Sequence, residues 1–296
     1  MRLKVRAAMR TDVGVVRDSN EDVAFVDPLG RYAILADGMG GPGAGEIAAA
    51  TTVDVVRTCL DTYGEVIDGF IAAPSADGRD RIRALTERAV HLAHDVVIER
   101  QRKEPEKHGM GTTLEVVVVA GSEAFVTHVG DSRTYLVRDG VATQVTADHT
   151  VAEAMKRSGV ISDSAAKISP LRTVLSSAVG MQAAVAVDHA VLHVRPGDRL
   201  LICSDGLHDY FDADELASRL SIADLDAALS GMITDARQRG GHDNITGILL
   251  EPVDPGAPIA GVPDDALDSL VDRTLREASA PVERIPNRDS SGRHRR

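Results

Sequence analysis

Short β-branched runs separated by glycine-containing breaks dominate the middle of this chain. They follow one another from Glu115 to Thr146, and an Asp139-Gly140 pair separates the last two. An Asp-Gly pair between two apolar runs signals a tight hairpin turn, and consecutive hairpins build an antiparallel sheet. The same composition returns at residues 22–26, 32–36, 185–194, 199–203 and 245–250. The sequence therefore predicts a strand-rich protein.

Helical patterns fall in blocks between these strands. Ala, Val, Leu and Ile recur at spacings of three and four in residues 45–60, 79–102, 151–158 and 225–239. Antiparallel strands interrupted by pairs of helices favour an α+β fold over a doubly wound parallel sheet. We expect a central β-sandwich of two antiparallel sheets, flanked by helices on both sides.

The composition disfavours nucleic acids and membranes as partners of this chain. The formal net charge of −12 repels polyanions, and 3% aromatic residues without Trp offer few stacking surfaces for single-stranded nucleic acid. No apolar stretch reaches the roughly 18 residues of a membrane span, and the basic start lacks the apolar run of a signal peptide. Cys59 and Cys203 lie far apart, which favours reduced thiols. We expect a cytoplasmic monomer with no nucleic-acid partner and no membrane span.

The composition changes after Leu250. Residues 251–258 are rich in proline, residues 263–279 have the apolar spacing of one amphipathic helix, and the polar end closes in Arg293-His294-Arg295-Arg296. We expect one domain over residues 1–252. Residues 253–296 are expected to form a proline-rich linker, a short amphipathic helix and a disordered basic tail, whose few charges favour a solvated role.

Aspartates stand where several apolar runs end. Asp37 and Asp205 are each followed by glycine, and Asp243 directly precedes Asn244 and an apolar run. Asp-Gly alone predicts only a turn, but an unpaired carboxylate at the boundary of a buried strand is costly to desolvate. Shared coordination of Mg²⁺ or Mn²⁺ would offset that cost, because both ions prefer oxygen ligands. The sequence therefore predicts a divalent-cation site.

An arginine precedes an acidic pair near the start of the chain. Arg17 stands before Glu21 and Asp22, at the mouth of the strand expected at residues 22–26. Arginine suits bidentate capture of phosphate, and carboxylates can orient metal-bound water. Alone, this segment would be interpreted as a charged loop. Together with the aspartates, it favours phosphate chemistry.

These segments, taken in order, resemble the bacterial metal-dependent Ser/Thr protein phosphatases of type 2C. The matching motifs are Arg17-x-x-Asn20-Glu21-Asp22, Ala36 to Gly41, Gly111 to Leu114, Val129 to Arg133, Thr146-x-Asp148-His149, Ser204 to Leu207 and Asp243 to Thr246. The resemblance covers roughly residues 8–250. It implies a central β-sandwich with the metal centre at one end.

The resemblance also implies roles for single residues. Asp37 would bridge two Mn²⁺ or Mg²⁺ ions, and the carbonyl of Gly38 would bind one of them. Asp205 and Asp243 would complete the other site. Asp131, with Asp205, matches a third and weaker metal position. The predicted metal residues are Asp37, Gly38, Asp131, Asp205, Asp243, Glu21 and Asp22, and the predicted catalytic residues are Arg17, Asp37, Asp205 and Asp243.

The implied reaction is hydrolysis of phosphoserine and phosphothreonine in proteins. Two cations about 3.5–4 Å apart would share a hydroxide nucleophile. Arg17, which matches the phosphate-binding arginine, and the ions would neutralise the phosphate oxygens without a covalent phosphoenzyme. Substrates would be proteins phosphorylated by a bacterial Ser/Thr kinase. Residues 152–179 correspond to the family's mobile flap, where we expect substrate choice to reside.

The chain departs from the family where relatives carry a histidine. Met39 stands at the position of the proposed general acid, and Pro42 at a second common histidine position. His149 and His242 lie near motif residues and are interpreted as structural. Two alternatives stay open: a phosphatase of an anti-sigma-factor antagonist, and a non-catalytic phosphoprotein-binding regulatory module of the same fold. The first usually lacks the arginine and the Asn-Glu-Asp element, and the second would be favoured by loss of a metal aspartate.

Overall fold

The computed structural model describes residues 3–41, 43–181 and 183–256. The chain separates into two units, Met1–Pro255 and Gly256–Arg296. All of the fold described below belongs to the first unit. Of the linker, helix and tail predicted for residues 253–296, only residues 253–256 lie within the described part.

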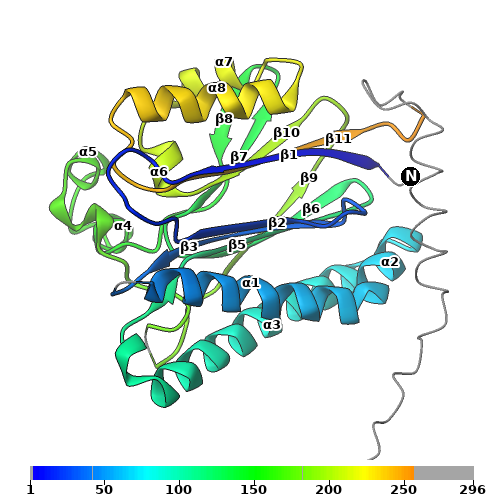
Figure 1. The fold of residues 1–296 in the computed structure, drawn as a ribbon. Coiled ribbons are helices and arrows are strands. Elements are labelled where there is room, and N and C mark those ends of the chain that lie inside the picture. Colours follow the sequence, from blue (N-terminus) through cyan, green and yellow to red (C-terminus); the bar gives the residue numbers. More distant parts are fainter. Residues whose placement is uncertain (1–2, 42, 182, 257–296) are drawn as a thin grey trace, which may run out of the picture. The chain divides into compact units, whose positions relative to one another are not determined.

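Two antiparallel sheets face each other in this unit (Figure 1). One sheet has the strand order β1-β11-β10-β7-β8, and the other has the order β2-β3-β5-β6-β9, with β4 paired to β3. The strands are β1 (Lys4–Asp12), β2 (Asp22–Val26), β3 (Tyr32–Met39), β4 (Gly111–Thr112), β5 (Leu114–Ala120), β6 (Glu123–Val129), β7 (Arg133–Arg138), β8 (Val141–Gln144), β9 (Asp188–His193), β10 (Arg199–Cys203) and β11 (Ile245–Val253). The predicted α+β sandwich is confirmed.

Helices cover the outer faces of both sheets (Figure 1). The six-stranded sheet carries α1 (Ala44–Thr62), α2 (Gly64–Ala72) and α3 (Ala76–Lys103), and a 3₁₀ turn, η1 (Pro105–Lys107), follows α3. The five-stranded sheet carries α6 (Asp205–His208), α7 (Ala213–Arg219) and α8 (Leu225–Gln238). The flap contains α4 (Val151–Arg157), α5 (Asp163–Lys167) and η2 (Pro170–Thr173). Among the described residues, none of these helices has the length and apolar character of a membrane span.

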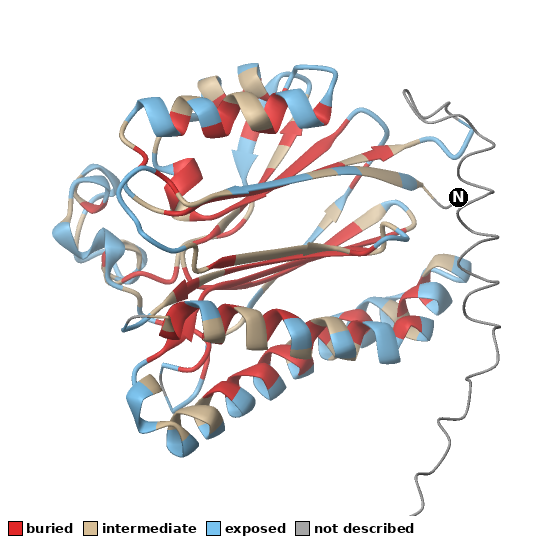
Figure 2. Ribbon diagram, in the orientation of Figure 1, coloured by how far each residue is buried: buried red, intermediate tan, exposed pale blue. Residues whose placement is uncertain are grey.

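Strand β5 shows why the central apolar runs are continuous. Val116 and Val118 pack toward α1 and α3, whereas Val117 and Val119 pack toward the opposite sheet. Successive side chains of a strand point to opposite faces, so a strand covered on both faces is apolar at every position. Figure 2 shows the resulting buried layers between the sheets and beneath the helices.

Two features of the five-stranded sheet differ from the expected pattern. β1 lies at one edge and, within the described residues, pairs with β11 alone. Its sequence is charged and partly exposed, so it lacks the apolar pattern by which a strand is predicted. β11 continues past Leu250 to Val253, and Pro252 pairs with Val5 of β1. The last partner of β11 on β10 is opposite Leu250, so the missing N–H of Pro252 breaks no bond to β10.

The layer between the sheets predicts a stability difference between two small substitutions. Ile202 is fully buried there, whereas Val191 on β9 is 49% exposed. We expect Ile202→Ala to lower the free energy of unfolding by about 2–5 kcal/mol, and Val191→Ala by no more than about 0.5 kcal/mol. Urea unfolding monitored by circular dichroism measures both values. Equal losses would contradict this placement of the core.

Candidate metal centre

Strand pairing brings the predicted acidic residues to one end of the sandwich. Asp22 opens β2 and pairs directly with Asp37 on β3. In the other sheet, Asp205 follows the end of β10 and Asp243 precedes the start of β11. Because β10 and β11 run antiparallel, the end of one strand meets the beginning of the other. The two pairs of carboxylates therefore face each other from different sheets.

A hydrogen bond joins the two sheets at this end. The hydroxyl of Ser204 donates to Oδ2 of Asp22 over 2.8 Å and accepts from the backbone N–H of Thr246 at 3.1 Å. Both Ser204 and Thr246 are fully buried, and Asp22 is 7% exposed. Ser204 is thus a positioning residue whose role was not apparent from the Ser-Asp-Gly motif.

Burial and mutual repulsion raise the pKa values of these carboxyls. Burial lifts the pKa of Asp37 well above its ordinary value, and the charges of Asp22, Asp205, Asp131 and Asp243 add to the effect. Burial is also the main cause for Asp22, whose pKa rises to about 6, and for Asp131, whose pKa rises to about 7. The pKa of Asp205 is raised in the same way. A like-charge cluster of this kind binds either protons or cations.

The donor chemistry fits a hard divalent cation. Oδ1 of Asp22 and Oδ1 of Asp205 are buried and have no hydrogen-bond partner among the described residues. Carboxylate oxygens are the ligands that Mg²⁺ and Mn²⁺ prefer. Within the same residues, no three His, Cys, Asp or Glu side chains are already arranged to hold one ion. Binding therefore requires the carboxylates to adjust toward a shared ion.

Glu21 lies at the N-terminus of α1. Its carboxylate accepts hydrogen bonds from the backbone N–H groups of Gly45 and Glu46, and burial raises its pKa. A carboxylate at this position satisfies free N–H groups and interacts favourably with the helix dipole. A helix-capping role thus accompanies the predicted metal role of Glu21. The sequence did not reveal it because Glu21 lies more than 20 residues from the helix it caps.

A close main-chain contact holds β3 against this helix. A Cβ atom on Gly38 would lie 2.2 Å from the carbonyl oxygen of Gly45, and one on Gly45 would lie 2.8 Å from the Glu21 carboxylate. Real Cβ atoms do not approach backbone so closely. β3 and the start of α1 can therefore approach this closely only if positions 38 and 45 are both glycine.

Arg17 is at the open side of the cluster. Its guanidinium donates to Oδ2 of Asp243 over 2.6 Å, and its side chain is 51% exposed. The buried Asn244 secures the loop that carries Arg17, because its amide donates to the carbonyls of Val13 and Ser19. The Asp243-Asn244 motif alone does not reveal this role of Asn244, because Val13 and Ser19 are distant in sequence.

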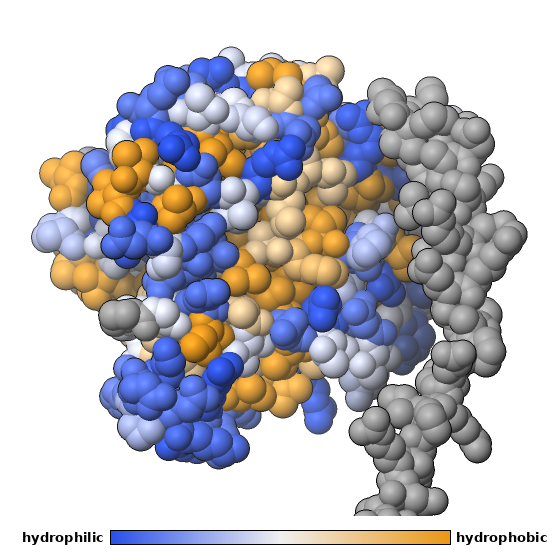
Figure 3. Space-filling model, in the orientation of Figure 1, coloured by the Kyte–Doolittle hydropathy of each residue, from blue (hydrophilic) through white to orange (hydrophobic). Residues whose placement is uncertain are grey.

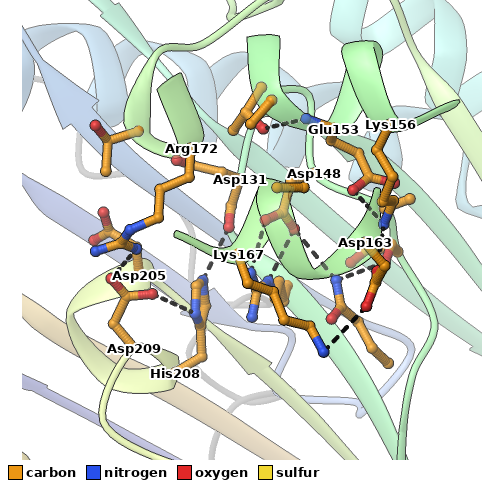
Figure 4. Close-up of a pocket in the computed structure, with 18 of the residues that line it drawn as sticks. Asp131, Asp148, Glu153, Lys156, Asp163, Lys167, Arg172, Asp205, His208 and Asp209 are labelled. Atoms are coloured by element: carbon orange, nitrogen blue, oxygen red, sulfur yellow. Dashed lines mark hydrogen bonds and ion pairs between the residues drawn. The ribbon is translucent and has the colours of Figure 1, made fainter. Parts of the chain in front are cut away.

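A polar pocket of about 630 Å³ opens beside Asp131 and Asp205 and extends beneath the flap. Figure 4 shows these two carboxylates lining the same pocket as Lys156, Lys167 and Arg172 of the flap. Arg172 donates to Asp209, close to Asp205 in sequence, over 3.0 Å. The flap therefore brings both signs of charge to a cavity that begins at the acidic cluster, because Lys156 and Lys167 pair there with Glu153 and Asp163.

The remaining positions singled out in the sequence are Met39, Pro42, His149 and His242. Met39 ends β3, and Pro42 lies outside the described residues. His242 is exposed, and its backbone N–H donates to the hydroxyl of Tyr210. His149 is buried, and its backbone N–H donates to the carbonyl of Gly130, next to Asp131. The backbone contacts of both histidines are compatible with the structural interpretation, which stays a prediction for their side chains.

The raised pKa values predict that the metal-free protein is more stable in mild acid. Folded-state pKa values of about 6 for Asp22 and about 7 for Asp131 exceed the value near 3.9 of unfolded aspartate. The folded chain therefore binds more protons, so the free energy of unfolding falls as the pH rises from about 4 to 7. Carboxyls with lowered pKa, such as Asp148, titrate below this window.

Urea unfolding in EDTA at pH 5.5 and pH 8 tests this expectation. The unfolding midpoint should be higher at pH 5.5, and Asp22→Asn should reduce the difference. Asp54→Asn is the control, because the Asp54 side chain is 72% exposed on α1. A midpoint that is equal or higher at pH 8 for the wild type would contradict the raised pKa values.

Comparisons with known proteins agree with the fold. A family model described as protein phosphatase 2C matches residues 16–244. The serine/threonine protein phosphatase PstP of Mycobacterium tuberculosis is 33% identical over 252 residues, which cover 85% of this chain and 46% of PstP. The serine/threonine phosphatase stp of Listeria monocytogenes is 33% identical over 254 residues, covering 83% of this chain and 96% of stp. This chain thus spans about half the length of PstP.

Solved structures show the same relationship. The crystal structure of M. tuberculosis PstP superposes with a TM-score of 0.75 at 32% identity, covering 85% of this chain and 100% of that chain. The catalytic domain of PstP in complex with two manganese ions gives a TM-score of 0.72 at 32% identity, with the same coverage. The chain belongs to the protein phosphatase 2C family.

Proposed function

We propose that this chain hydrolyses phosphoserine and phosphothreonine in proteins with the help of Mn²⁺ or Mg²⁺. One observation carries the proposal: partly or fully buried aspartates from both sheets converge beside an exposed arginine, and two of their oxygens have no hydrogen-bond partner among the described residues. The Ser/Thr phosphatases similar to this chain, and the PstP catalytic domain with two manganese ions, support it. We assign the activity to a domain over residues 1–252.

The aspartates would hold the cations. Asp37 would bridge two ions, with the Gly38 carbonyl on one of them and Asp205 and Asp243 on the other. Asp131, together with Asp205, would provide a third and weaker position. Two such ions, when bound, lower the pKa of a water that they share and so provide a hydroxide nucleophile near neutral pH.

Glu21 and Asp22 would act around the ions. The Glu21 carboxylate is engaged by the N-terminus of α1, and Asp22 is held by Ser204. Both carboxylates are thereby oriented before any ion binds. Each would then accept hydrogen bonds from water in the cluster.

Arg17 would bind the phosphate group of the substrate. Its guanidinium already lies against Asp243 and is half-exposed, so a phosphate can reach it from solvent. A guanidinium matches two phosphate oxygens at once and neutralises part of their charge. Met39 has no proton to donate, so the leaving alkoxide would take its proton from a water molecule.

The proposed substrates are proteins that a bacterial Ser/Thr kinase has phosphorylated. Different phosphoproteins would bind with different affinities because they contact the flap pocket beside Asp131 differently. The flap also exposes Val160 and Ile168, and Figure 3 shows apolar and polar side chains mixed on the flap side of the molecule. Cys59 and Cys203 are both free, which supports the expected cytoplasmic location.

Loss of a central carboxylate should abolish turnover. We expect wild-type protein to hydrolyse p-nitrophenyl phosphate and a phosphothreonine peptide with Mn²⁺ or Mg²⁺ but not in EDTA. Asp205→Ala should lower kcat/KM at least about 100-fold, because even residues that only support metal ligands cost 10–100-fold. Asp54→Ala, on the exposed face of α1, should leave the rate unchanged. Metal binding without turnover on either substrate would contradict the proposal and favour the regulatory module.

A substitution of Arg17 tests its role in phosphate binding without removing a proposed metal ligand. Arg17→Ala should lower kcat/KM for the phosphopeptide by roughly 10–100-fold, which corresponds to a hydrogen bond to a charged group. Arg10→Ala is the matched control, because Arg10 is an exposed arginine on β1 whose ion pair is with Asp226. An Arg17→Ala enzyme with unchanged kcat/KM would exclude this role.

A further inference from the structure

His149 joins the turn that carries Asp131 to the base of the flap. Its backbone N–H donates to the carbonyl of Gly130 over 2.6 Å, and the N–H of Gly130 donates back to Nδ1 of His149 at 3.3 Å. One backbone bond and one side-chain bond thus connect the same two residues. The second bond depends on the imidazole, whereas any residue except proline could make the first.

The imidazole is fixed in orientation from two other directions. Nε2 lies 3.2 Å from Oδ2 of Asp188 on β9, and the ring lies 4.6 Å from the ring of His128 on β6. His128 is itself hydrogen-bonded to the buried Glu115. Because Nδ1 accepts from Gly130, the proton is on Nε2 and points at Asp188. Burial, helped by the nearby His128, lowers the pKa of His149 and favours this neutral form.

His149 also belongs to the base of the flap. Its carbonyl accepts from the N–H of Ser176 at 2.8 Å, and the N–H of Val151 donates to the carbonyl of Val174 at 2.8 Å. A bridge between Thr150 and Leu175 lies between these bonds. The chain therefore enters and leaves the flap as a short paired ladder that begins at His149.

The Asp131 turn has little freedom to reposition itself. Gly130 has a φ of 106°, and a Cβ atom there would lie 2.6 Å from the side chain of Thr113. The hydroxyls of Thr113 and Ser132 are hydrogen-bonded at 2.7 Å, and Nε2 of His208 donates to the carbonyl of Asp131 over 3.0 Å. These bonds hold the turn on the sheet side. His149 holds it on the flap side.

We propose that His149 is a positioning residue, whose imidazole orients Asp131 and ties it to the flap base. The cation position shared by Asp131 and Asp205 then depends on His149, although His149 is not a ligand. This inference rests on the proposed function, because that function assigns Asp131 to a metal. It also links the flap pocket mechanically to that cation position.

Two polar variants of His149 separate its two side-chain contacts. The short side-chain amide introduced by His149→Asn reaches the place of Nδ1 and can accept from the N–H of Gly130. The longer amide introduced by His149→Gln reaches toward Asp188 but leaves the buried Gly130 N–H without its acceptor. Both new side chains are polar and uncharged; glutamine is close to histidine in size and asparagine is one methylene shorter. His189→Gln is the control, because His189 lies on β9 beside Asp188 and bonds to Thr127 instead.

The readout is binding of Mn²⁺ alone to the full chain, followed by electron paramagnetic resonance of the free ion. Asp131→Ala identifies the class of ions that depends on Asp131. We expect His149→Gln to weaken that class about tenfold and to leave the tighter ions unchanged. His149→Asn and His189→Gln should bind within about twofold of wild type. The His149→Gln variant should also require more Mn²⁺ for half-maximal phosphatase activity.

The outcomes distinguish this inference from the proposed function. His149→Asn and His149→Gln variants that bind Mn²⁺ equally well, or a wild type whose binding equals that of Asp131→Ala, would overturn the inference. A wild type that binds Mn²⁺ in the expected way but hydrolyses neither phosphate substrate would overturn the proposed function instead. Melting temperatures of all variants, measured in EDTA, show whether a difference arises from folding.

Discussion

Repulsion among carboxylates that are partly or fully buried is the constraint on which the arrangement at this end of the sandwich depends. Asp37 and Asp205 lie where burial and neighbouring negative charge both raise their pKa values. Such a cluster opposes folding unless protons or cations neutralise it. The two sheets supply the opposing force, because their apolar layer is buried between them. A stable sandwich thus holds together groups that would otherwise separate.

Contacts at the ends of the strands hold the mutually repelling carboxylates in defined positions. Ser204 bonds across the sheets to Asp22, Glu21 caps α1, and Asn244 secures the Arg17 loop. Each contact joins segments that are distant in sequence. The site is therefore preorganised by its surroundings, although its carboxylates still have to move to share an ion.

Much of the fold could be predicted from the sequence because its signals are local. The valine run of β5 is covered on both faces, and the long helices α1, α3 and α8 carry clear apolar spacing. The edge strand β1 and the one-turn helix α6 were missed, since an edge strand is partly polar and one turn has no periodicity. The capping role of Glu21 and the contacts of His149 were also missed. Both depend on which distant segment lies opposite, and no local pattern encodes that.

The contact between Gly38 and Gly45 has a consequence for how the protein can vary. The acidic segment of β3 is located by this main-chain contact and by the hydroxyls of Thr112 and Thr113, which bond to the carbonyl and the N–H of Asp37, and not by side chains of the surface loops. Substitutions in the surrounding loops would change charge and shape at the mouth of the site without moving Asp37. The same contact makes these two positions intolerant of any side chain. The loops around the acidic cluster can therefore diverge quickly while the framework that holds Asp37 scarcely changes.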